Sequence, residues 1–201
     1  MSRRVQLFFK RLFDLVVSAV LLVILSPLLF FIALAIRISM GRPVLYEWNV
    51  VGNGGRPFRG YKFRTMVHGA DQLKEELLDR NEMRGPVFKL KDDPRVTPIG
   101  RILRKFSLDE LPQLWSVLKG DMSLVGPRPP LAYEYEQFEE WHKRKLTIKP
   151  GMTCLWQVSG KPADFHEWLL LDFEYIDHWS LWLDMQILFK TALFVVTGKN
   201  F

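Results

Sequence analysis

The sequence predicts a helix-rich α/β protein with a small β-hairpin, attached to one face of a membrane. Three observations predict it: a long apolar stretch broken at its midpoint, a glycine-rich turn between β-prone segments, and amphipathic patterns with helical spacing elsewhere. The chain of 201 residues is long enough for one domain with its own core. We expect a membrane hairpin over residues 1–42 and a globular domain with interfacial helices over residues 43–201.

The apolar stretch runs from Leu12 to Ile36, and at about 1.5 Å per residue it could cross a hydrocarbon core of roughly 30 Å. Both of its flanks are basic, so the positive-inside rule places both ends in the cytoplasm. Ser26 and Pro27 favour a kink at its midpoint, because proline removes a backbone hydrogen bond and serine can satisfy the freed carbonyl. The pattern therefore favours a re-entrant hairpin over a simple transmembrane helix. Asp14 is expected to pair locally with Arg11.

The segment from Pro43 to Met66 is the predicted hairpin. Its β-branched and aromatic runs flank the turn Gly52-Asn53-Gly54-Gly55. Its second arm alternates aromatic and basic residues, which would place Lys62 and Arg64 on one face of the strand. These cations fit either a solvated edge strand or a face that binds an anion.

Most of the remaining chain is predicted to be helical. The expected helices lie within Ala70 to Arg80, Ile99 to Phe106, Ala132 to Lys145 and, as a pair, Asp164 to Gly198. The second of these is basic and suits lipid headgroups or a phosphate. Asp92 and Asp93 occupy a proline-rich loop, where aspartate is more often part of a turn than a metal ligand.

The segment with the densest chemistry is SLDELPQLWSVLKGDMSLVGPRP, from Ser107 to Pro129. Ser107 and Glu110 have the spacing of a capping box, which opens a helix, although the helix could instead begin at Pro112. Either way Asp109 and Glu110 would lie near a helix N-terminus, where free amides and the dipole favour anions. The two acids are then either a helix cap or a pair able to hold a divalent cation.

The same segment ends in Gly126-Pro127-Arg128-Pro129, a rigid turn that carries one guanidinium. Such an arginine is either part of a surface turn or a fork for phosphate oxygens. Its combination with the paired carboxylates indicates a site for a metal ion and a phosphate.

This central segment resembles the signature of the bacterial sugar transferases, the monotopic polyprenyl-phosphate phosphoglycosyl transferases. YKFRTM (61–66), FKLKDDPRVTPIG (88–100) and KPGMTCLWQVSGK (149–161) resemble further blocks of that family. In the last block Cys154 stands where glycine is usual, and Lys161 replaces the usual arginine, keeping the charge but losing the bidentate fork. The WSLWLD block (179–184) resembles the branch that transfers hexose-1-phosphate.

The resemblance implies an enzyme of the bacterial inner membrane with its catalytic domain on the cytoplasmic face. The implied reaction moves a sugar-1-phosphate from a UDP-sugar, with UDP-glucose and UDP-galactose leading, to undecaprenyl phosphate and releases UMP. This is the first membrane step of polysaccharide or glycoconjugate synthesis. A helix broken at Ser-Pro and dipping into the membrane is also typical of the family, so membrane lipids are expected partners.

The resemblance also implies roles for individual residues. Asp109 would attack the sugar-bound phosphate and form an aspartyl phosphosugar intermediate. Glu110, together with Asp109, would hold Mg²⁺. The cations expected to bind phosphate oxygens are Lys62, Arg64, Arg104, Arg128 and Lys161.

Composition leaves other functions to be weighed. A formal charge of +6 and a pI near 9.5 suit nucleic acid, anionic lipid or a phosphorylated substrate equally well. No nucleic-acid partner is expected, because most aromatic residues lie in apolar runs rather than on a solvated face. A single cysteine excludes an internal disulfide and a cysteine-built zinc site, and Cys154 is expected to pack as a small apolar side chain.

The alternative function is a non-catalytic scaffold that binds anionic lipid at the membrane surface, which predicts liposome binding without UMP release. The sequence leaves open which sugar and pathway are used, whether the chain forms a homo-oligomer, and whether it is a minimal catalytic form or part of a longer protein.

Overall fold

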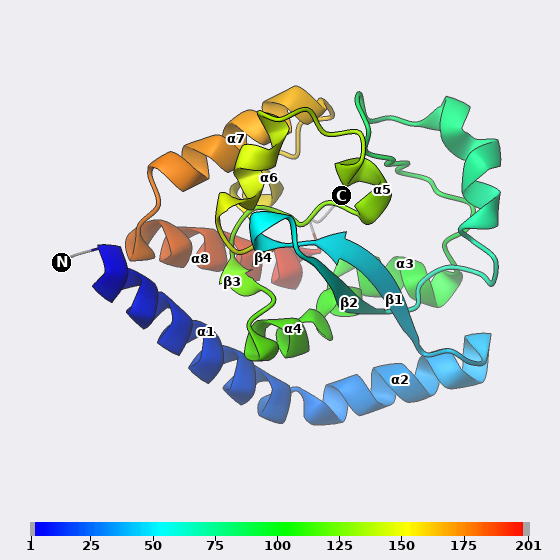
Figure 1. The fold of residues 1–201 in the computed structure, drawn as a ribbon. Helices are drawn as coiled ribbons and strands as arrows, with labels where there is room; N and C mark the ends of the chain where they lie inside the picture. Colours follow the sequence, from blue (N-terminus) through cyan, green and yellow to red (C-terminus); the bar gives the residue numbers. More distant parts are fainter. Residues whose placement is uncertain (1–2, 199–201) are drawn as a thin grey trace.

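The computed structural model describes residues 3–198, and it begins with two helices that meet at a bend. The helix α1 (Arg3–Ile24) is followed by α2 (Ser26–Met40), and the helical path bends by 60° between them (Figure 1). Pro27 lies in the first turn of α2 and has no N–H for the carbonyl oxygen of Val23, which accepts a hydrogen bond from Ser26 Oγ at 2.8 Å instead. The bend therefore lies at the predicted position. Within residues 3–198 no single helix meets the length and apolarity of a membrane span, whereas the bent pair α1–α2 meets both.

The predicted hairpin is present. Strands β1 (Leu45–Val51) and β2 (Pro57–Phe63) pair antiparallel, with Leu45 opposite Phe63 and Val51 opposite Pro57. The connection contains the 3₁₀ turn η1 (Asn53–Gly55), in which Gly54 and Gly55 have positive φ angles that suit glycine. The glycines therefore serve the hairpin turn.

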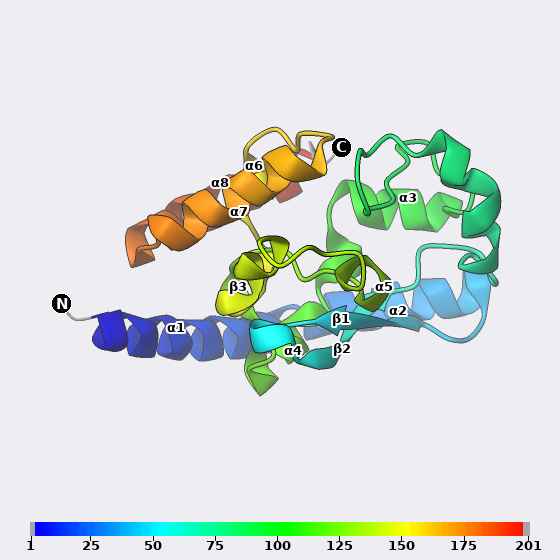
Figure 2. The ribbon, with the colours of Figure 1, turned by 45° about the horizontal axis from the view of Figure 1, so that its top comes forward.

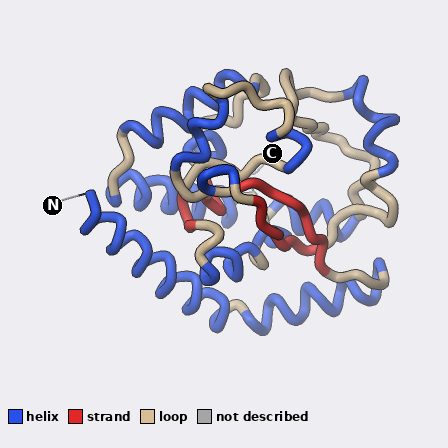
Figure 3. Tube along the Cα trace, in the orientation of Figure 1, coloured by secondary structure: helices blue, strands red, loops and turns tan. Residues whose placement is uncertain are grey.

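A second small sheet pairs β3 (Ser123–Val125) with β4 (Gly151–Thr153) in parallel. The remaining helical elements are η2 (Gln72–Arg80), α3 (Pro98–Lys105), η3 (Leu108–Glu110), α4 (Gln113–Lys119), α5 (Ala132–Tyr135), η4 (His142–Thr147), α6 (Leu155–Val158), α7 (Phe165–Asp177) and α8 (Leu181–Thr197). A helix-rich α/β fold with small sheets is thus confirmed, and the helices surround the strands (Figure 3).

The main core lies between the N-terminal and C-terminal helices. Figure 2 shows α1, α2 and the hairpin in one layer, with α6, α7 and α8 in another. Leu114, Val117, Val125, Tyr175 and Ile187 are buried between the layers, and one face of α1 packs against them. The opposite face of α1 is apolar but exposed.

Polar side chains of α1 attach this helix to the segment that joins α4 to β3. Arg11 donates two hydrogen bonds, of 2.7 and 2.8 Å, to carbonyl oxygens near the end of α4. Asp14 is 3% exposed and accepts hydrogen bonds from Ser123 Oγ at 2.8 Å and the Leu124 amide at 3.1 Å. The expected local pair of Asp14 with Arg11 is wrong, because each residue binds the chain of the globular part instead.

Lys10 extends this attachment to α7 and α8. Its Nζ donates to the carbonyl oxygen of Val125 at 3.0 Å and to Asp184 Oδ2 at 2.6 Å. Tyr175 O–H donates to Asp184 Oδ1 at 2.7 Å and to the same carbonyl at 3.1 Å. The end of β3 is therefore held by α1, α7 and α8 together.

The single helix expected from Ala132 to Lys145 is wrong. Helix α5 ends at Tyr135, and the chain turns before η4 begins at His142. Packing of the Phe138 ring against the rings of Tyr135, His142 and Phe165 outweighs the helical spacing here. The segment from Gln72 to Arg80 is helical as expected, but with 3₁₀ geometry.

Removing the Asp14 carboxylate is expected to destabilise the fold. Asp14→Ala leaves the Ser123 hydroxyl and the Leu124 amide without their acceptor in a buried place, which costs about 2 kcal/mol. Unfolding in detergent micelles, followed by circular dichroism, measures the loss. Val16→Ala is the matched control on the exposed face of α1, where Val16 is 53% exposed, and is expected to change stability by less than about 0.5 kcal/mol. Equal stability of the two variants would contradict the structural role of Asp14.

Candidate active site

The two acids of the central segment lie on a tight turn between α3 and α4. Ser107 precedes this turn with a left-handed backbone (φ 51°) and makes no capping hydrogen bond through its side chain, so the predicted capping box is wrong. Helix α4 begins instead just after Pro112, which was the alternative start. Asp109 and Glu110 belong to the single 3₁₀ turn η3. The unusual backbone at Ser107 redirects the chain and presents both acids on this turn.

Glu110 binds two cations that come from distant parts of the chain. Its Oε1 accepts a hydrogen bond from Lys62 Nζ of β2 at 2.6 Å and lies 3.7 Å from Arg128 Nη1 of the loop after β3. The ring of Trp48, on β1, lies 4.3 Å from Lys62 Nζ and 5.9 Å from the Arg128 guanidinium carbon. The hairpin, the turn and the Gly-Pro-Arg-Pro loop therefore converge on one carboxylate.

The neighbouring acids differ in their electrostatic state. Burial raises the pKa of Asp109 to about 6 and the charge of Glu110 adds to the rise, while Lys62 and Arg104 oppose it. Burial alone would raise the pKa of Glu110 too, but Lys62 and Arg128 outweigh it and hold the pKa of this carboxyl below its ordinary value. A pair of acids whose pKa values are driven apart is typical of catalytic sites.

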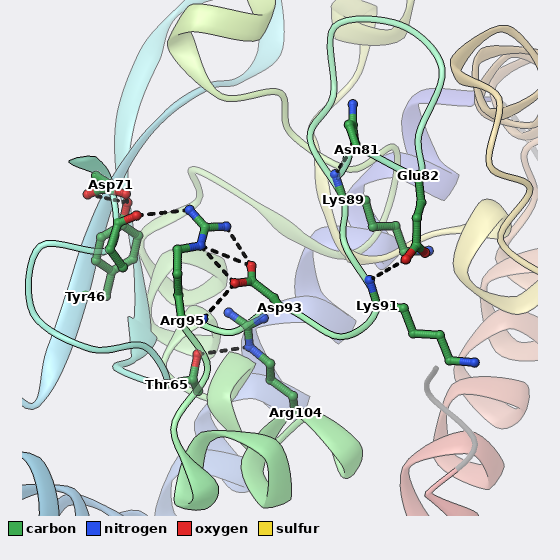
Figure 4. Close-up of polar contacts among 11 residues, drawn as sticks. Tyr46, Thr65, Asp71, Asn81, Glu82, Lys89, Lys91, Asp93, Arg95 and Arg104 are labelled. Atoms are coloured by element: carbon green, nitrogen blue, oxygen red, sulfur yellow. Dashed lines mark hydrogen bonds and ion pairs between the residues drawn. The ribbon is translucent and has the colours of Figure 1, made fainter. Parts of the chain in front are cut away.

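Arg104 and Lys161 complete the cationic surroundings. Arg104 lies on α3, where its Nε donates to Thr65 Oγ1 at 3.0 Å (Figure 4), and its charge acts on Asp109. Lys161 follows α6 with a positive φ of 50°, and its charge contributes to the lowered pKa of Glu110. The structure thus brings four of the five predicted phosphate-binding cations to the acid pair.

Arg64 is the exception. Its guanidinium donates to the carbonyl oxygens of Met40, Gly41 and Arg42, the last two at 3.0 and 2.9 Å, and so closes the end of α2. The strand ends at Phe63, so the alternation that would have placed Arg64 beside Lys62 does not continue. The structure does not bring Arg64 to the acid pair.

Asp93 of the proline-rich loop serves the fold. Figure 4 shows Asp93 bound by the guanidinium of Arg95, with Nε 2.9 Å from Oδ1 and Nη2 2.6 Å from Oδ2, and both side chains are buried. Arg95 also donates to the carbonyl oxygen of Ala70 at 3.0 Å. This agrees with the turn interpretation of the Asp-Pro pair.

Sequence reasoning missed Trp48 and Lys89. Trp48 lies opposite Gly60 in the hairpin, and its indole occupies the space that a side chain at Gly60 would take. Lys89 lies 5.2 Å from the ring of Trp156 and belongs to the same group of charges as Arg128 and Lys161. The tryptophan could have been found from the glycine that faces it across the predicted hairpin, and Lys89 from its place in the FKLKDDPR block.

The acid pair suits a magnesium ion whose remaining ligands come from the substrate, rather than a metal site built only from protein side chains. Among residues 3–198 no group of three acidic, histidine or cysteine side chains could hold a metal ion. Mg²⁺ is commonly bound by one or two carboxylates together with substrate phosphates and water. Asp109 is buried, and Glu110 beside it is partly buried among cations, a donor set that suits an ion completed by a diphosphate.

Comparison with known proteins agrees with this geometry. Residues 5–198 match the family described as bacterial sugar transferase. The chain belongs to this family. The expected resemblance is therefore confirmed, and the match includes every residue of the acid pair and its cations.

Three relatives illustrate the similarity. The galactosyl transferase CpsE of Streptococcus agalactiae serotype III is 47% identical over 193 residues, which is 95% of this chain and 43% of the relative. The undecaprenyl-phosphate galactose phosphotransferase of Salmonella typhimurium is 45% identical over 201 residues, 98% of this chain and 42% of the relative. The exopolysaccharide production protein ExoY of Rhizobium meliloti is 40% identical over 196 residues, 95% of this chain and 87% of the relative. The chain thus spans about two fifths of the length of the first two.

The raised pKa of Asp109 predicts how its replacement affects stability. The pKa of this carboxyl is about 6 in the folded protein, above the value of about 3.9 for an unfolded chain. Because the folded protein binds this proton more tightly than the unfolded chain does, protonation of Asp109 stabilises the fold. This stabilisation is complete below about pH 4 and is lost as the pH rises through about 6. Asp109→Asn removes this titration, so the melting temperature of the variant relative to wild type should increase between pH 4 and pH 7.

Thermal unfolding in detergent with a chelator, so that metal ions do not contribute, measures this difference. Asp109→Ala is a second variant that also lacks the titrating carboxyl, but it leaves a cavity in the folded protein. Its melting temperature relative to wild type should show the same increase with pH, starting from a lower value. A difference that is independent of pH in both variants would contradict the raised pKa.

Proposed function

We propose that this chain transfers a sugar-1-phosphate from a UDP-sugar to undecaprenyl phosphate and releases UMP. The observation that carries the proposal is the adjacent pair of a buried Asp109 and a partly buried Glu110 on one turn, surrounded by four cations. The names of two relatives specify galactose, and one also specifies undecaprenyl phosphate. UDP-galactose is therefore the first donor to test and UDP-glucose the second.

The reaction would proceed in two displacements at one phosphorus atom. In the first, a carboxylate oxygen of Asp109 bonds to the sugar-bearing phosphorus while the bond to the UMP oxygen breaks, giving an aspartyl phosphosugar and UMP. In the second, a phosphate oxygen of undecaprenyl phosphate attacks the same phosphorus. The aspartyl–phosphorus bond breaks, so Asp109 is regenerated and undecaprenyl diphosphate sugar is formed.

The surrounding charges suit this chemistry. Asp109 combines a raised pKa, and therefore a more basic carboxylate, with substantial ionisation near neutral pH. Lys62 and Arg128, which lie at Glu110, and Arg104, whose charge acts on Asp109, would bind the phosphate oxygens and neutralise their charge. Mg²⁺ held by Asp109 and Glu110 would supply further neutralisation of the diphosphate.

We further propose that α1 and α2 dip into the cytoplasmic leaflet of the bacterial inner membrane and return. Both helices carry large exposed apolar side chains, among them Phe8, Val23, Phe30, Phe31 and Ile38. A continuous apolar surface of this kind is typical of a membrane or protein contact. The bend between the helices and the basic residues at both ends support a re-entrant path.

A lipid-binding scaffold without catalysis remains the alternative function. It accounts for the exposed apolar faces and the positive charge but gives no role to an acid pair with separated pKa values. UMP release distinguishes the two functions.

The catalytic proposal predicts that purified protein releases UMP from UDP-galactose or UDP-glucose in the presence of undecaprenyl phosphate and Mg²⁺. Asp109→Asn should fold and release no UMP, because the amide is not a nucleophile. Glu110→Gln should lose about 10²-fold in rate and respond more weakly to Mg²⁺, because one anionic ligand is lost. Glu136→Gln, at an exposed position, is the matched control and should retain turnover. Full activity of Asp109→Asn would refute its assignment as the nucleophile.

The membrane proposal predicts that cysteines introduced at Arg4 and at Ser39 react with an impermeant maleimide from the cytoplasmic side alone. The native Cys154 is buried and should not interfere. Pro27→Leu restores a backbone donor to the bend and should move part of the population to a straight, spanning helix. The re-entrant path would be excluded if, in protein that keeps Pro27, the cysteines introduced at Arg4 and Ser39 were labelled from opposite faces of the membrane.

A further inference from the structure

An apolar cavity of about 170 Å³ reaches Glu110 of the acid pair from the side of α1 and α8. Its walls include Leu21 of α1, Leu114 of α4, and Leu188 and Val195 of α8. Glu110 also lines this cavity, and the same side chain binds Lys62 on β2. One carboxylate therefore lies at the boundary between an apolar space and a group of cations.

Three polar side-chain atoms in the cavity wall, Thr153 Oγ1, Thr191 Oγ1 and Gln157 Oε1, make hydrogen bonds within the protein. The hydroxyl oxygens of Thr153 and Thr191 lie 2.8 Å apart, and Thr191 also donates to the carbonyl oxygen of Ile187 at 2.8 Å. Gln157 Oε1 accepts from the Cys154 amide at 3.0 Å. With these groups satisfied, the wall favours a hydrocarbon over a polar ligand.

We propose that this cavity binds the isoprene units next to the phosphate of the polyprenyl phosphate acceptor. The inference rests on the proposed function and adds the place where the lipid chain enters. A volume of about 170 Å³ has room for at least one five-carbon unit, since a water molecule takes about 30 Å³ in the liquid. With its hydrocarbon end there, the acceptor's phosphate would lie beside Lys62 and Arg128 and close to Asp109.

The apolar wall of the cavity adjoins the charged side chains around Glu110 directly, and this favours a polyprenyl phosphate over a bilayer phospholipid as the ligand. In a polyprenyl phosphate the hydrocarbon is attached directly to the phosphate. A phospholipid instead places glycerol and two ester carbonyl groups between its phosphate and its acyl chains, and these polar groups would lie unpaired against the leucines and valines of the wall. The helices that form the wall also carry exposed apolar side chains, such as Val20 of α1 and Phe189 of α8, along which the rest of the chain can leave.

The test fills the cavity and follows the two displacements separately. Val195→Trp places a large side chain in the cavity, whereas Val196→Trp, at a neighbouring position that is 80% exposed, is the matched control. Release of UMP without acceptor reports the first displacement, and turnover with a ten-carbon prenyl phosphate or undecaprenyl phosphate reports the second.

Val195→Trp should raise the KM for both prenyl phosphates at least tenfold, while the amount of UMP released without acceptor and the KM for UDP-sugar stay at wild-type values. Val196→Trp should leave all four quantities unchanged. An unchanged acceptor KM in folded Val195→Trp would overturn the proposal. Absence of UMP release from wild type would instead show failure of the proposed function.

Photolabelling gives a second readout that does not depend on a bulky variant. A prenyl phosphate with a diazirine on its first isoprene unit should label peptides of α4 and α8 that face the cavity, and excess phosphatidylglycerol should not prevent it. Labelling confined to α2, or labelling abolished by phosphatidylglycerol, would overturn the assignment of the cavity to the acceptor.

Discussion

The adjacent carboxylates of Asp109, which is buried, and Glu110, which is partly buried, require nearby cations, and the described part of the fold supplies them. An uncompensated buried charge is strongly destabilising, and two next to each other repel as well. Lys62 reaches Glu110 from the hairpin, and Arg128 approaches it from the loop after β3. Arg104 acts on Asp109 from α3. The short strands matter here because β2 carries Lys62 and β3 leads into the loop that carries Arg128, so they bring both cations to the turn η3.

The N-terminal helix takes part in the same arrangement. Lys10 and Tyr175, which both donate to Asp184, also donate to the carbonyl of Val125, while Asp14 binds the two preceding residues of β3. Since β3 leads directly into the turn that carries Arg128, these contacts also fix the base of that turn. The helix proposed to enter the membrane is thus joined through buried hydrogen bonds to the strand that positions a phosphate-binding residue.

Local sequence signals predicted the features that depend on local chemistry. Pro27 and the glycines at 52–55 determine their own backbone, so the bend and the hairpin turn lie where expected. The spacing of Ser107 and Glu110 wrongly predicted a capping box. Glu110 instead forms ion pairs with Lys62 and Arg128, which lie far from it in sequence. Asp14, Arg64 and Phe138 were misjudged for the same reason: their partners are carbonyl groups, amides or rings brought close only by the tertiary fold. The acid pair itself was visible in the sequence, whereas the contrast between its two pKa values depends on burial and on those distant cations.

Formation of a covalent intermediate can be observed directly by intact-mass spectrometry of wild-type protein incubated with UDP-galactose and Mg²⁺ without any lipid acceptor. Attack by Asp109 predicts a mass increase equal to one hexose phosphate, located by peptide mapping on Asp109 and removed when undecaprenyl phosphate is added. If protein that turns over when undecaprenyl phosphate is present formed no adduct in its absence, this account would be contradicted and direct attack by the lipid phosphate would be favoured. An adduct on another residue, such as Asp121, would show that the nucleophile lies elsewhere.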